Sequence, residues 1–340
     1  MDDENRNSLR PVYNIKAISR LVGLLPGTLR AWERRYGLPI PRRGEQGYRL
    51  YSDYDLRTLV WIKSQIDTGL NISRVVKYLK ELRAEGKDPA KNHSVSIPQT
   101  AVSIPALARQ FKEALERFDD GLATQTLRRA FTIYTVDAVL LEIIQPTLVA
   151  LGEAWHQGKL PIVVEHFATQ FCLQYLNSLM ASSVVPTRAG LMVAACAPGE
   201  SHQIGLISLV VMLRWRGWDV KYLGPDLKLD RMEEGLIPLL PSLILISATL
   251  PQNALHLEEL KNILVRFPNP KPLIILGGQA FETLRLSDAI PALYLNTHLS
   301  STVERIETLM AEIQSGDNQA KTILPKYLLN TKGEGRKIVH

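Results

Sequence analysis

The loop at residues 200–205 constrains the fold of this chain more than any other stretch. It joins a wholly apolar run at 191–195 to an apolar segment of helical length at 204–214. From here to residue 312, short apolar runs alternate with helix-like segments, which is typical of a parallel β-sheet covered on both faces. Such sheets hold ligands at the carboxyl ends of their strands, where this loop lies. A Rossmann-like sheet of five parallel strands is therefore predicted for residues 188–312.

This loop contains a histidine between a carboxylate and a glycine. Glu200 lies two residues before His202, and Gly205 lies three after it. Imidazole is a suitable ligand for cobalt, and a hydrogen-bond acceptor on its other nitrogen fixes the ring. Glu200 is a candidate for that acceptor. A lone histidine in such a loop is more often structural or merely exposed, so these residues alone leave both interpretations open.

Two further signals follow apolar runs in the same region. Ser247 comes directly after the run 243–246, and Gly277 with Gly278 follows the run 273–276. With the loop, they resemble the cobalamin-binding signature Asp-x-His-x-x-Gly, Ser-x-Leu and Gly-Gly. The resemblance implies a cobalamin site whose lower cobalt ligand is a histidine. The residues it points to in this sheet are Glu200, His202, Gly205, Ser247, Thr249, Gly277 and Gly278.

The match to this signature departs from the pattern at two positions. Glu200 stands where the signature has aspartate, and Thr249 stands where it has leucine. The first change lengthens the hydrogen-bonding arm, and the second alters packing. Neither removes the cobalt ligand.

Residues 106–185 are helical in pattern throughout and predict an antiparallel four-helix bundle. The expected helices cover about 106–118, 121–134, 136–157 and 162–184. Pro146 lies inside the third helix and is expected to kink it. The turn before the fourth helix brings together Trp155, His156, Glu165 and His166. Taken alone, this tryptophan and these histidines are more often core or capping residues, and one helix-end pair is too small for a zinc site.

The N-terminal region is strongly basic. Residues 14–80 contain 13 Lys/Arg and five acids, a net charge of +8, whereas the whole chain carries +6. Residues 12–84 are expected to form a helix, a turn at 23–27, a second helix that Thr28 caps, and a basic wing. This is the geometry of a winged helix-turn-helix DNA reader. A solvated basic surface is the alternative that charge alone would favour.

The sequence of this region is more specific than its charge. Residues 28–38, 41–43 and 47–51 closely resemble the winged DNA-binding domain of the MerR family. The resemblance implies a dimer on an inverted repeat of double-stranded operator DNA, although the coiled-coil dimerisation helix usual there is not evident. The DNA-binding residues expected here are Thr28, Arg30, Arg34, Arg35, Arg43, Tyr48 and Arg49. Residues 85–105 are polar and predict an extended linker, and 315–340 predict a flexible tail.

The order of these three regions resembles the light-sensing transcriptional repressors of the CarH/LitR type. The resemblance implies adenosylcobalamin as cofactor and a tetramer that binds DNA in the dark. Trp155 would then shelter the adenosyl group over the upper cobalt face, and Glu165 and His166 would help to hold it. His156 would take the upper cobalt position after light, and His202 would be the lower ligand throughout.

Two alternatives remain at this point. The chain could be a cobalamin-dependent regulator that does not respond to light, or a corrinoid carrier for methyl transfer. The basic head disfavours the carrier, which has no use for it. The acidic, polar start of the chain is unlike a secretory signal, and its uninterrupted apolar runs are far shorter than the ~20 residues that span a bilayer. A cytoplasmic, non-enzymatic protein without membrane contact is expected.

Overall fold

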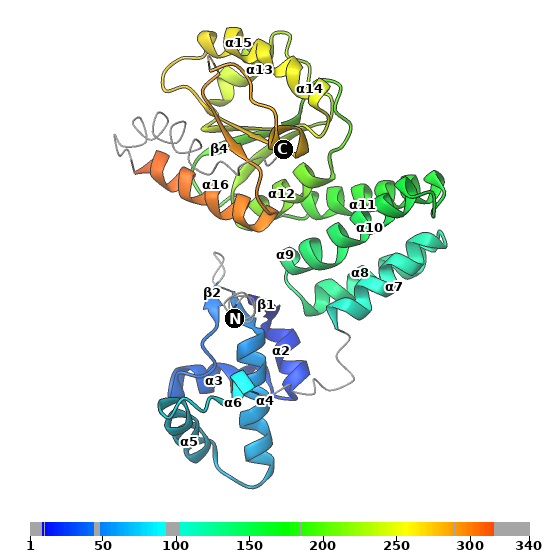
Figure 1. Ribbon diagram of the computed structural model, residues 1–340. Coiled ribbons are helices and arrows are strands. Elements are labelled where there is room, and N and C mark those ends of the chain that lie inside the picture. Colours follow the sequence, from blue (N-terminus) through cyan, green and yellow to red (C-terminus); the bar gives the residue numbers. More distant parts are fainter. Residues whose placement is uncertain are drawn as a thin grey trace, which may run out of the picture. The chain divides into compact units, whose positions relative to one another are not determined.

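The computed structural model of the protein describes residues 9, 11–43, 48–92, 103–183, 185–288 and 290–315. The chain divides into two compact units, Met1–Phe171 and Cys172–His340 (Figure 1). The expected flexible tail, most of the expected linker and part of the wing loop lie outside the described residues.

A small head of helices and one three-stranded sheet begins the first unit. Its antiparallel sheet has the strand order β1-β3-β2, with β1 (Pro11–Asn14), β2 (Arg42–Arg43) and β3 (Arg49–Ser52). Its helices are α2 (Ile15–Val22), α3 (Pro26–Tyr36), α4 (Asp53–Asp67), α5 (Ile72–Ala84) and α6 (Pro89–Asn92). This confirms the predicted winged helix-turn-helix.

Local chemistry fixes where the helices of the head begin and end. Asn14 caps α2 by accepting the Ala17 N–H at 2.9 Å, and Ser52 and Asp55 form a reciprocal capping box at α4. Gly23 ends α2 with a φ of 71°, in the left-handed region where glycine is favoured. These signals set the helix–turn–helix crossing that carries α3.

Two expectations for the head need correction. Thr28 does not cap α3, because the helix already begins at Pro26, whose fixed φ suits the first helical position. The expected linker is also not extended along its whole length, because α6 lies inside it. Asp88 accepts the Ala90 N–H at 3.0 Å, and Ala90 is completely buried. This buried turn extends the head to residue 92.

The next helices form the predicted four-helix bundle. They are α7 (Ile104–Glu116), α8 (Asp120–Ile133), the helix formed by α9 (Val136–Val139), η1 (Leu140–Ile144) and α10 (Gln145–His156), and α11 (Ile162–Ala181). Phenylalanine contacts between α7 and α11 stabilise the packing, with ring centroids of Phe111 and Phe171 6.0 Å apart. The bounds agree with the predicted ones to within a few residues.

The third bundle helix departs from α-helical geometry just before its proline. The turn η1 is π-helical, and the Gln145 N–H donates to the Leu140 carbonyl, five residues back. Pro146 has no N–H to donate, so the disturbance expected there takes the form of a π turn. By length and composition this helix, Val136–His156, is also the one candidate among the described residues for crossing a membrane, with 39% of its apolar window buried.

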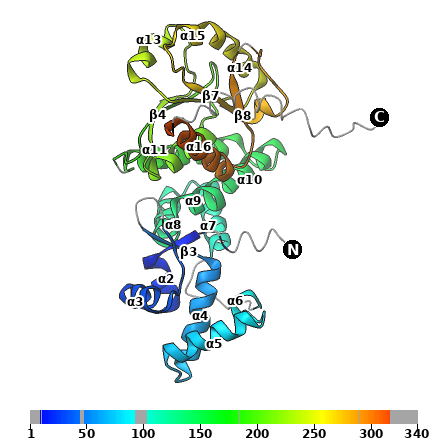
Figure 2. The ribbon, with the colours of Figure 1, turned by 90° about the vertical axis from the view of Figure 1, so that its left-hand side faces the viewer.

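The second unit contains the predicted sheet of five parallel strands, in the order β5-β4-β6-β7-β8. The strands are β4 (Leu191–Cys196), β5 (Asp219–Gly224), β6 (Leu243–Ser247), β7 (Leu273–Gly277) and β8 (Ala292–Leu295). Helices α12 (Ile204–Trp215) and α16 (Leu299–Gln314) pack together on one face. The other face carries α13 (Met232–Leu236), η2 (Ile237–Leu239), α14 (Pro251–Leu255), η3 (His256–Glu259) and α15 (Leu260–Arg266) (Figures 1 and 2).

This strand order places a switch point between β4 and β6. The chain leaves β4 toward one edge of the sheet and later returns to β6 on the other side, so the loops after these two strands diverge. The predicted alternation is less regular after β7, where the short 3-10 turn η4 (Gln279–Glu282) replaces a full helix. The loop with Glu200 and His202 follows β4 and therefore lies at the switch point.

Candidate functional site

The Glu200 carboxylate and the His202 ring form a directly bonded pair in the loop between β4 and α12. Glu200 Oε1 lies 2.5 Å from His202 Nδ1 and also accepts the His202 backbone N–H at 2.9 Å. The Glu200 side chain is fully buried, whereas 57% of the His202 side chain is exposed. With Nδ1 directed to the carboxylate, Nε2 is the ring nitrogen left to bind a metal.

The second oxygen of Glu200 ties this loop to the loop after β6. Glu200 Oε2 accepts the backbone N–H groups of Thr249 at 2.8 Å and Leu250 at 3.0 Å. It also accepts Asn253 Nδ2 at 3.2 Å. One buried carboxylate thus joins the two loops of the switch point and fixes the orientation of His202.

These donors keep Glu200 ionised in spite of its burial. Desolvation alone would raise the pKa of the carboxyl group, but hydrogen bonds from His202, Leu250 and Thr249 lower it to about 2. An ionised carboxylate accepts the Nδ1 proton and makes Nε2 a better metal ligand. The longer glutamate arm therefore still performs the orienting role that the signature gives to aspartate.

The remaining signature residues of the sheet lie at neighbouring strand ends. Ser247 pairs with Cys196 of β4 on one side and with Gly277 of β7 on the other. Gly278 has a φ of 101°, and a Cβ at this position would lie 2.4 Å from the Ala248 carbonyl oxygen. The chain itself therefore requires glycine at 278, whether or not a ligand is bound.

Gly205 differs, because the described residues leave the space around it open. A Cβ built at this position would meet no heavy atom within 4 Å among them. The opening lies in the first turn of α12, three residues after His202. An exposed imidazole on a buried carboxylate, next to a glycine that the fold does not need, fits the lower face of a bulky cobalt macrocycle.

The bundle residues singled out by sequence lie in the first unit, around the turn between α10 and α11. The rings of Trp155 and His156 are 4.3 Å apart. Glu165 Oε2 lies 3.8 Å from Nε2 of His166, whose side chain is 68% exposed. Glu165 also accepts the Thr169 hydroxyl at 2.8 Å. These side chains are held more loosely than the Glu200–His202 pair.

Three or more His, Cys, Asp or Glu side chains do not gather into a metal-binding group anywhere in the described part of the chain. The groups at the α10–α11 turn and at the β4–α12 loop therefore each offer isolated imidazoles. An isolated imidazole can supply one axial ligand to a metal whose other ligands come from a cofactor.

The second helix of the head presents its arginines to solvent. Arg30, Arg34 and Arg35 are exposed on α3, and within the described residues none of them forms an ion pair. Thr28 lies half-buried in the first turn of the same helix, and Tyr48 beside the wing is 69% exposed. An exposed basic helix after a helix–turn can enter the major groove of DNA.

The two expected wing arginines are not independent of this helix. Arg49 Nε lies 2.5 Å from Glu33 Oε2, and Arg43 lies 3.5 Å from Glu33 Oε1. Arg43 and Arg49 are also cross-strand partners between β2 and β3. Glu33 of α3 therefore clamps the wing to the helix, and Arg49, only 24% exposed, is held largely for this purpose.

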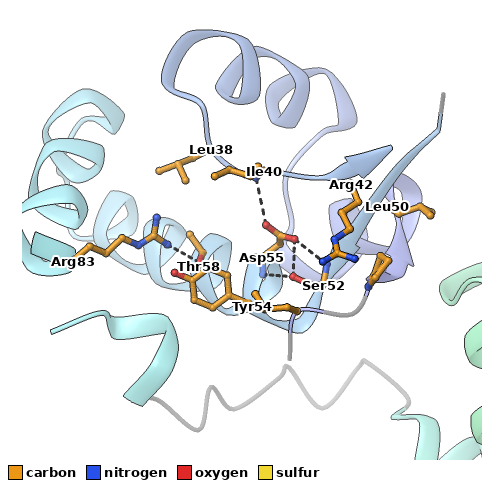
Figure 3. Close-up of a pocket in the computed structure, with 11 residues that line it drawn as sticks. Leu38, Ile40, Arg42, Leu50, Ser52, Tyr54, Asp55, Thr58 and Arg83 are labelled. Carbon is orange, nitrogen blue, oxygen red and sulfur yellow. Dashed lines mark hydrogen bonds between the residues drawn. The ribbon is translucent and has the colours of Figure 1, made fainter. Parts of the chain in front are cut away.

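A cavity of about 230 Å³ lies elsewhere in the head, between the wing and α4 (Figure 3). Its apolar wall includes Leu38 and Ile40. Its carboxylate, Asp55, already accepts the backbone N–H groups of Ser52 at 2.9 Å and Ile40 at 3.4 Å. Because these polar groups satisfy one another, the cavity is accounted for by the packing of the wing.

Sequence reasoning missed two residues of these sites. Asn253 is buried and donates to Glu200 and, at 3.2 Å, to the Gly199 carbonyl. Its only sequence signal is its position shortly after Ser247. Glu33 was passed over inside a basic helix, although an acid among three arginines is itself a signal that one arginine needs a partner.

Comparison with known proteins finds matches to three stretches of the chain. Residues 13–82 match the MerR HTH family regulatory proteins, and residues 107–179 and 190–292 match two B12 binding domains. The chain is 28% identical over 270 residues to the HTH-type transcriptional repressor CarH of Myxococcus xanthus, covering 79% of this chain and 89% of CarH. It is 26% identical over 311 residues to CarA of the same organism, covering 90% and 98%.

Among solved structures, the monomethylamine corrinoid protein of Methanosarcina barkeri superposes with a TM-score of 0.48 and 16% identity. The match covers 60% of this chain and 98% of that protein. The sequence matches, the exposed arginines of α3 and the oriented imidazole at the switch point agree with one another. The chain thus contains one segment that matches the MerR HTH family regulatory proteins and two segments that match B12 binding domains, and it is similar over most of its length to the repressors CarH and CarA.

Proposed function

We propose that this protein is a transcriptional repressor. It binds operator DNA in the dark, when it carries adenosylcobalamin, and releases the DNA in the light. The observation that carries the proposal is the exposed His202 ring held by the buried Glu200 carboxylate at the switch point. It offers one oriented imidazole in the same chain as an exposed basic recognition helix. Similarity to two named repressors supports regulation as the outcome of cofactor binding.

Each group of residues then has a distinct task. His202 anchors the cofactor from the lower side, and Glu200 orients it. Trp155, Glu165 and His166 shelter the upper, adenosyl side, and His156 is the imidazole available there once the adenosyl group has left. When bound, adenosylcobalamin supplies a light-labile cobalt–carbon bond. Loosely held residues suit the side that changes, because they can rearrange at little cost.

The head supplies the DNA-binding surface whose activity the cofactor-bound state would control. Arg30, Arg34 and Arg35 would contact base edges and phosphates, with Thr28, Arg43, Tyr48 and Arg49 beside them. A homotetramer in the dark would bring several heads to one operator, and dissociation would weaken binding by loss of multivalency. We place this assembly in the cytoplasm, where its DNA lies.

The test is to load the purified protein with adenosylcobalamin in darkness and to measure operator binding, mass and absorption before and after green light. We expect tight binding in the dark, and lower mass and weaker binding after illumination. Binding and mass that do not change with light would exclude a photoreceptor. Dependence on cofactor without dependence on light would indicate a cobalamin-level sensor instead.

Two histidine variants assign the ligands. His202→Ala should weaken cofactor binding in the dark and change the absorption spectrum of whatever still binds. His156→Ala should leave the dark spectrum and dark DNA binding unchanged and alter only the illuminated spectrum. Loss of dark cofactor binding in the His156 variant would contradict its assigned role.

A further inference from the structure

Two segments far apart in the sequence meet inside the first unit. Strand β1 of the head lies against the turn between α8 and α9 of the bundle (Figures 1 and 2). Tyr13 and Tyr134 are partners in an antiparallel bridge, and the Thr135 N–H donates to the Val12 carbonyl at 2.9 Å. The two tyrosine rings lie 5.5 Å apart and are only 5% and 6% exposed. We name this contact the head–bundle joint.

The head side of the joint is tied to the elements that position the DNA-binding surface. The Tyr13 hydroxyl donates to Asp53 Oδ1 at 2.7 Å, at the first residue of α4. Asn14 caps α2 and also donates from Nδ2 to the Thr132 carbonyl of α8 at 3.3 Å. Helix α2 itself packs against α8. The joint therefore contacts the first helix of the helix-turn-helix and the helix that follows the wing.

The bundle side of the joint is the start of the third bundle helix. This helix ends at Trp155 and His156, which are proposed to face the cofactor. The Thr135 hydroxyl caps this helix by accepting the Ala138 N–H at 3.2 Å. The helix then runs for 21 residues, through the π turn η1, to Trp155 and His156. At 1.5 Å per residue it is about 30 Å long. A hydrogen-bonded helix of this length transmits a displacement of one end to the other.

The joint is also small enough to open. Among the described residues it includes the Thr135–Val12 backbone hydrogen bond, the Asn14–Thr132 hydrogen bond, the tyrosine ring pair and the α2–α8 packing. Interfaces of this size between domains of one chain are usually only marginally stable, so their closed and open states differ little in free energy. A small displacement at one end of the helix is then sufficient to shift the equilibrium between the closed and open states of the joint.

We propose that the head–bundle joint is an intramolecular docking surface that relays the state of the cofactor to the DNA-binding head. This inference rests on the proposed function. With the adenosyl group in place, the joint is closed and holds the head in one orientation, so that less freedom is lost on binding an operator. Movement of Trp155 and His156 after light shifts the helix, opens the joint and weakens the binding of each head.

The first experiment tests the relay with Tyr134→Ala in the full-length protein loaded with adenosylcobalamin. The dark operator affinity should fall about tenfold, because the head is no longer pre-oriented. The absorption spectrum, its change with light and the affinity after illumination should stay as in the wild type, so the dark/light affinity ratio shrinks. Tyr134→Phe keeps the ring of the joint and loses only the hydroxyl, which accepts the Ile104 backbone N–H, so its dark/light ratio should stay much closer to the wild type than that of Tyr134→Ala.

The matched control is Tyr78→Ala, which removes a half-exposed head tyrosine whose ring centroid lies 6.0 Å from that of Trp61. It should leave the dark/light ratio unchanged. An unchanged ratio in Tyr134→Ala would overturn the relay. No dark/light difference in the wild type would instead refute the proposed function, so the two failures are distinguishable.

A second experiment does not depend on how Tyr134→Ala folds. The double variant Tyr13→Cys with Tyr134→Cys places two thiols at bridge partners, whose Cα atoms lie about 5 Å apart, within disulfide range. The native thiols Cys172 and Cys196 are buried, with pKa values raised to about 12, and will not compete. With oxidised glutathione added as the oxidant, the disulfide should form in the dark and about fivefold more slowly after illumination. Equal rates, or no disulfide in the dark, would overturn the proposal.

Discussion

Two carboxylates orient functional side chains in this molecule, and they do so in very different surroundings. Glu200 is fully buried and accepts five hydrogen bonds, from His202, Thr249, Leu250 and Asn253. Glu33 is 22% exposed and contacts two arginines, one of them at 3.5 Å. The first holds one imidazole in one orientation, whereas the second links the wing strands β2 and β3 to helix α3.

The difference shows where rigidity is needed. A histidine that binds a metal must present one nitrogen in a fixed direction. A buried carboxylate with all its hydrogen bonds made holds the ring in that direction. A wing that adapts to a DNA backbone gains from a looser link, which solvent and salt weaken. Changes at Glu200 should therefore be large and insensitive to salt, and changes at Glu33 should be small and dependent on salt.

The largest expected effect is on stability in acid. The folded pKa of Glu200 is about 2, below its ordinary value of 4.5, so its contribution is present at neutral pH and is lost as the pH falls from about 4.5 toward 2. The loss should reach about 3 kcal/mol. Urea unfolding at several pH values, followed by hydrogen exchange in β4 and β6, measures it. A Glu200→Gln variant should lack this decline, and an equal decline in both proteins would contradict the assignment.

Next in size is the effect of Glu200→Gln on the cofactor. An amide cannot accept all the donors that surround the carboxylate, and its uncharged oxygen holds the Nδ1 proton of His202 less strongly. Cobalamin affinity should fall between about tenfold and 100-fold, as for other residues that orient metal-bound histidines. Titration followed by absorption measures the change, and Glu258→Gln on the same unit serves as control. An affinity within twofold of the wild type would exclude the orienting role.

A smaller effect is expected from Asn253→Ala. This change removes one of the five donors to Glu200 and the bond to the Gly199 carbonyl, while the backbone donors of Thr249 and Leu250 remain. The free energy of unfolding should fall by about 1–2 kcal/mol. Cobalamin affinity should fall less than in Glu200→Gln, as the same titration would show. A loss as large as that of Glu200→Gln would mean that Asn253 contributes more than one hydrogen bond.

The smallest effect should follow Glu33→Gln. The partly exposed Glu33 clamp is lost, and Arg43 and Arg49 are freed from their shared partner. Operator affinity should fall by only about threefold at low salt. The difference from the wild type should vanish as the salt concentration is raised. Fluorescence anisotropy over a salt series measures both. A change of 100-fold that persists at high salt would show that the head clamp is as rigid as the Glu200 site.

The architecture could be predicted because it depends on local signals. Apolar runs at regular spacing identify the five strands, and the loop at Glu200 and His202 is recognisable from residues close together in the chain. Boundaries were less accurate: Thr28 looked like a cap, but Pro26 begins the helix earlier. The short helix α6 was missed because its burial depends on α4, not on its own composition.

The contacts that connect the sites were beyond sequence reasoning. Asn253 reaches Glu200 across 53 positions, and Asn14 reaches Thr132 across 118. In neither case do the neighbouring residues in the sequence indicate the distant partner. Such pairs follow from how strands and helices pack, so they become visible only once the elements are placed in three dimensions.

The π turn at Leu140–Ile144 has a consequence for helical phase. A turn that takes one extra residue sets everything beyond it back by about 100° relative to an uninterrupted α-helix. The direction in which Trp155 and His156 face is therefore determined partly by this turn and not by their distance from Thr135 alone. Insertion or deletion of one residue between Gln145 and Trp155 would rotate both side chains around the helix axis. Deletion of one residue within the π turn would instead leave the direction of both side chains unchanged.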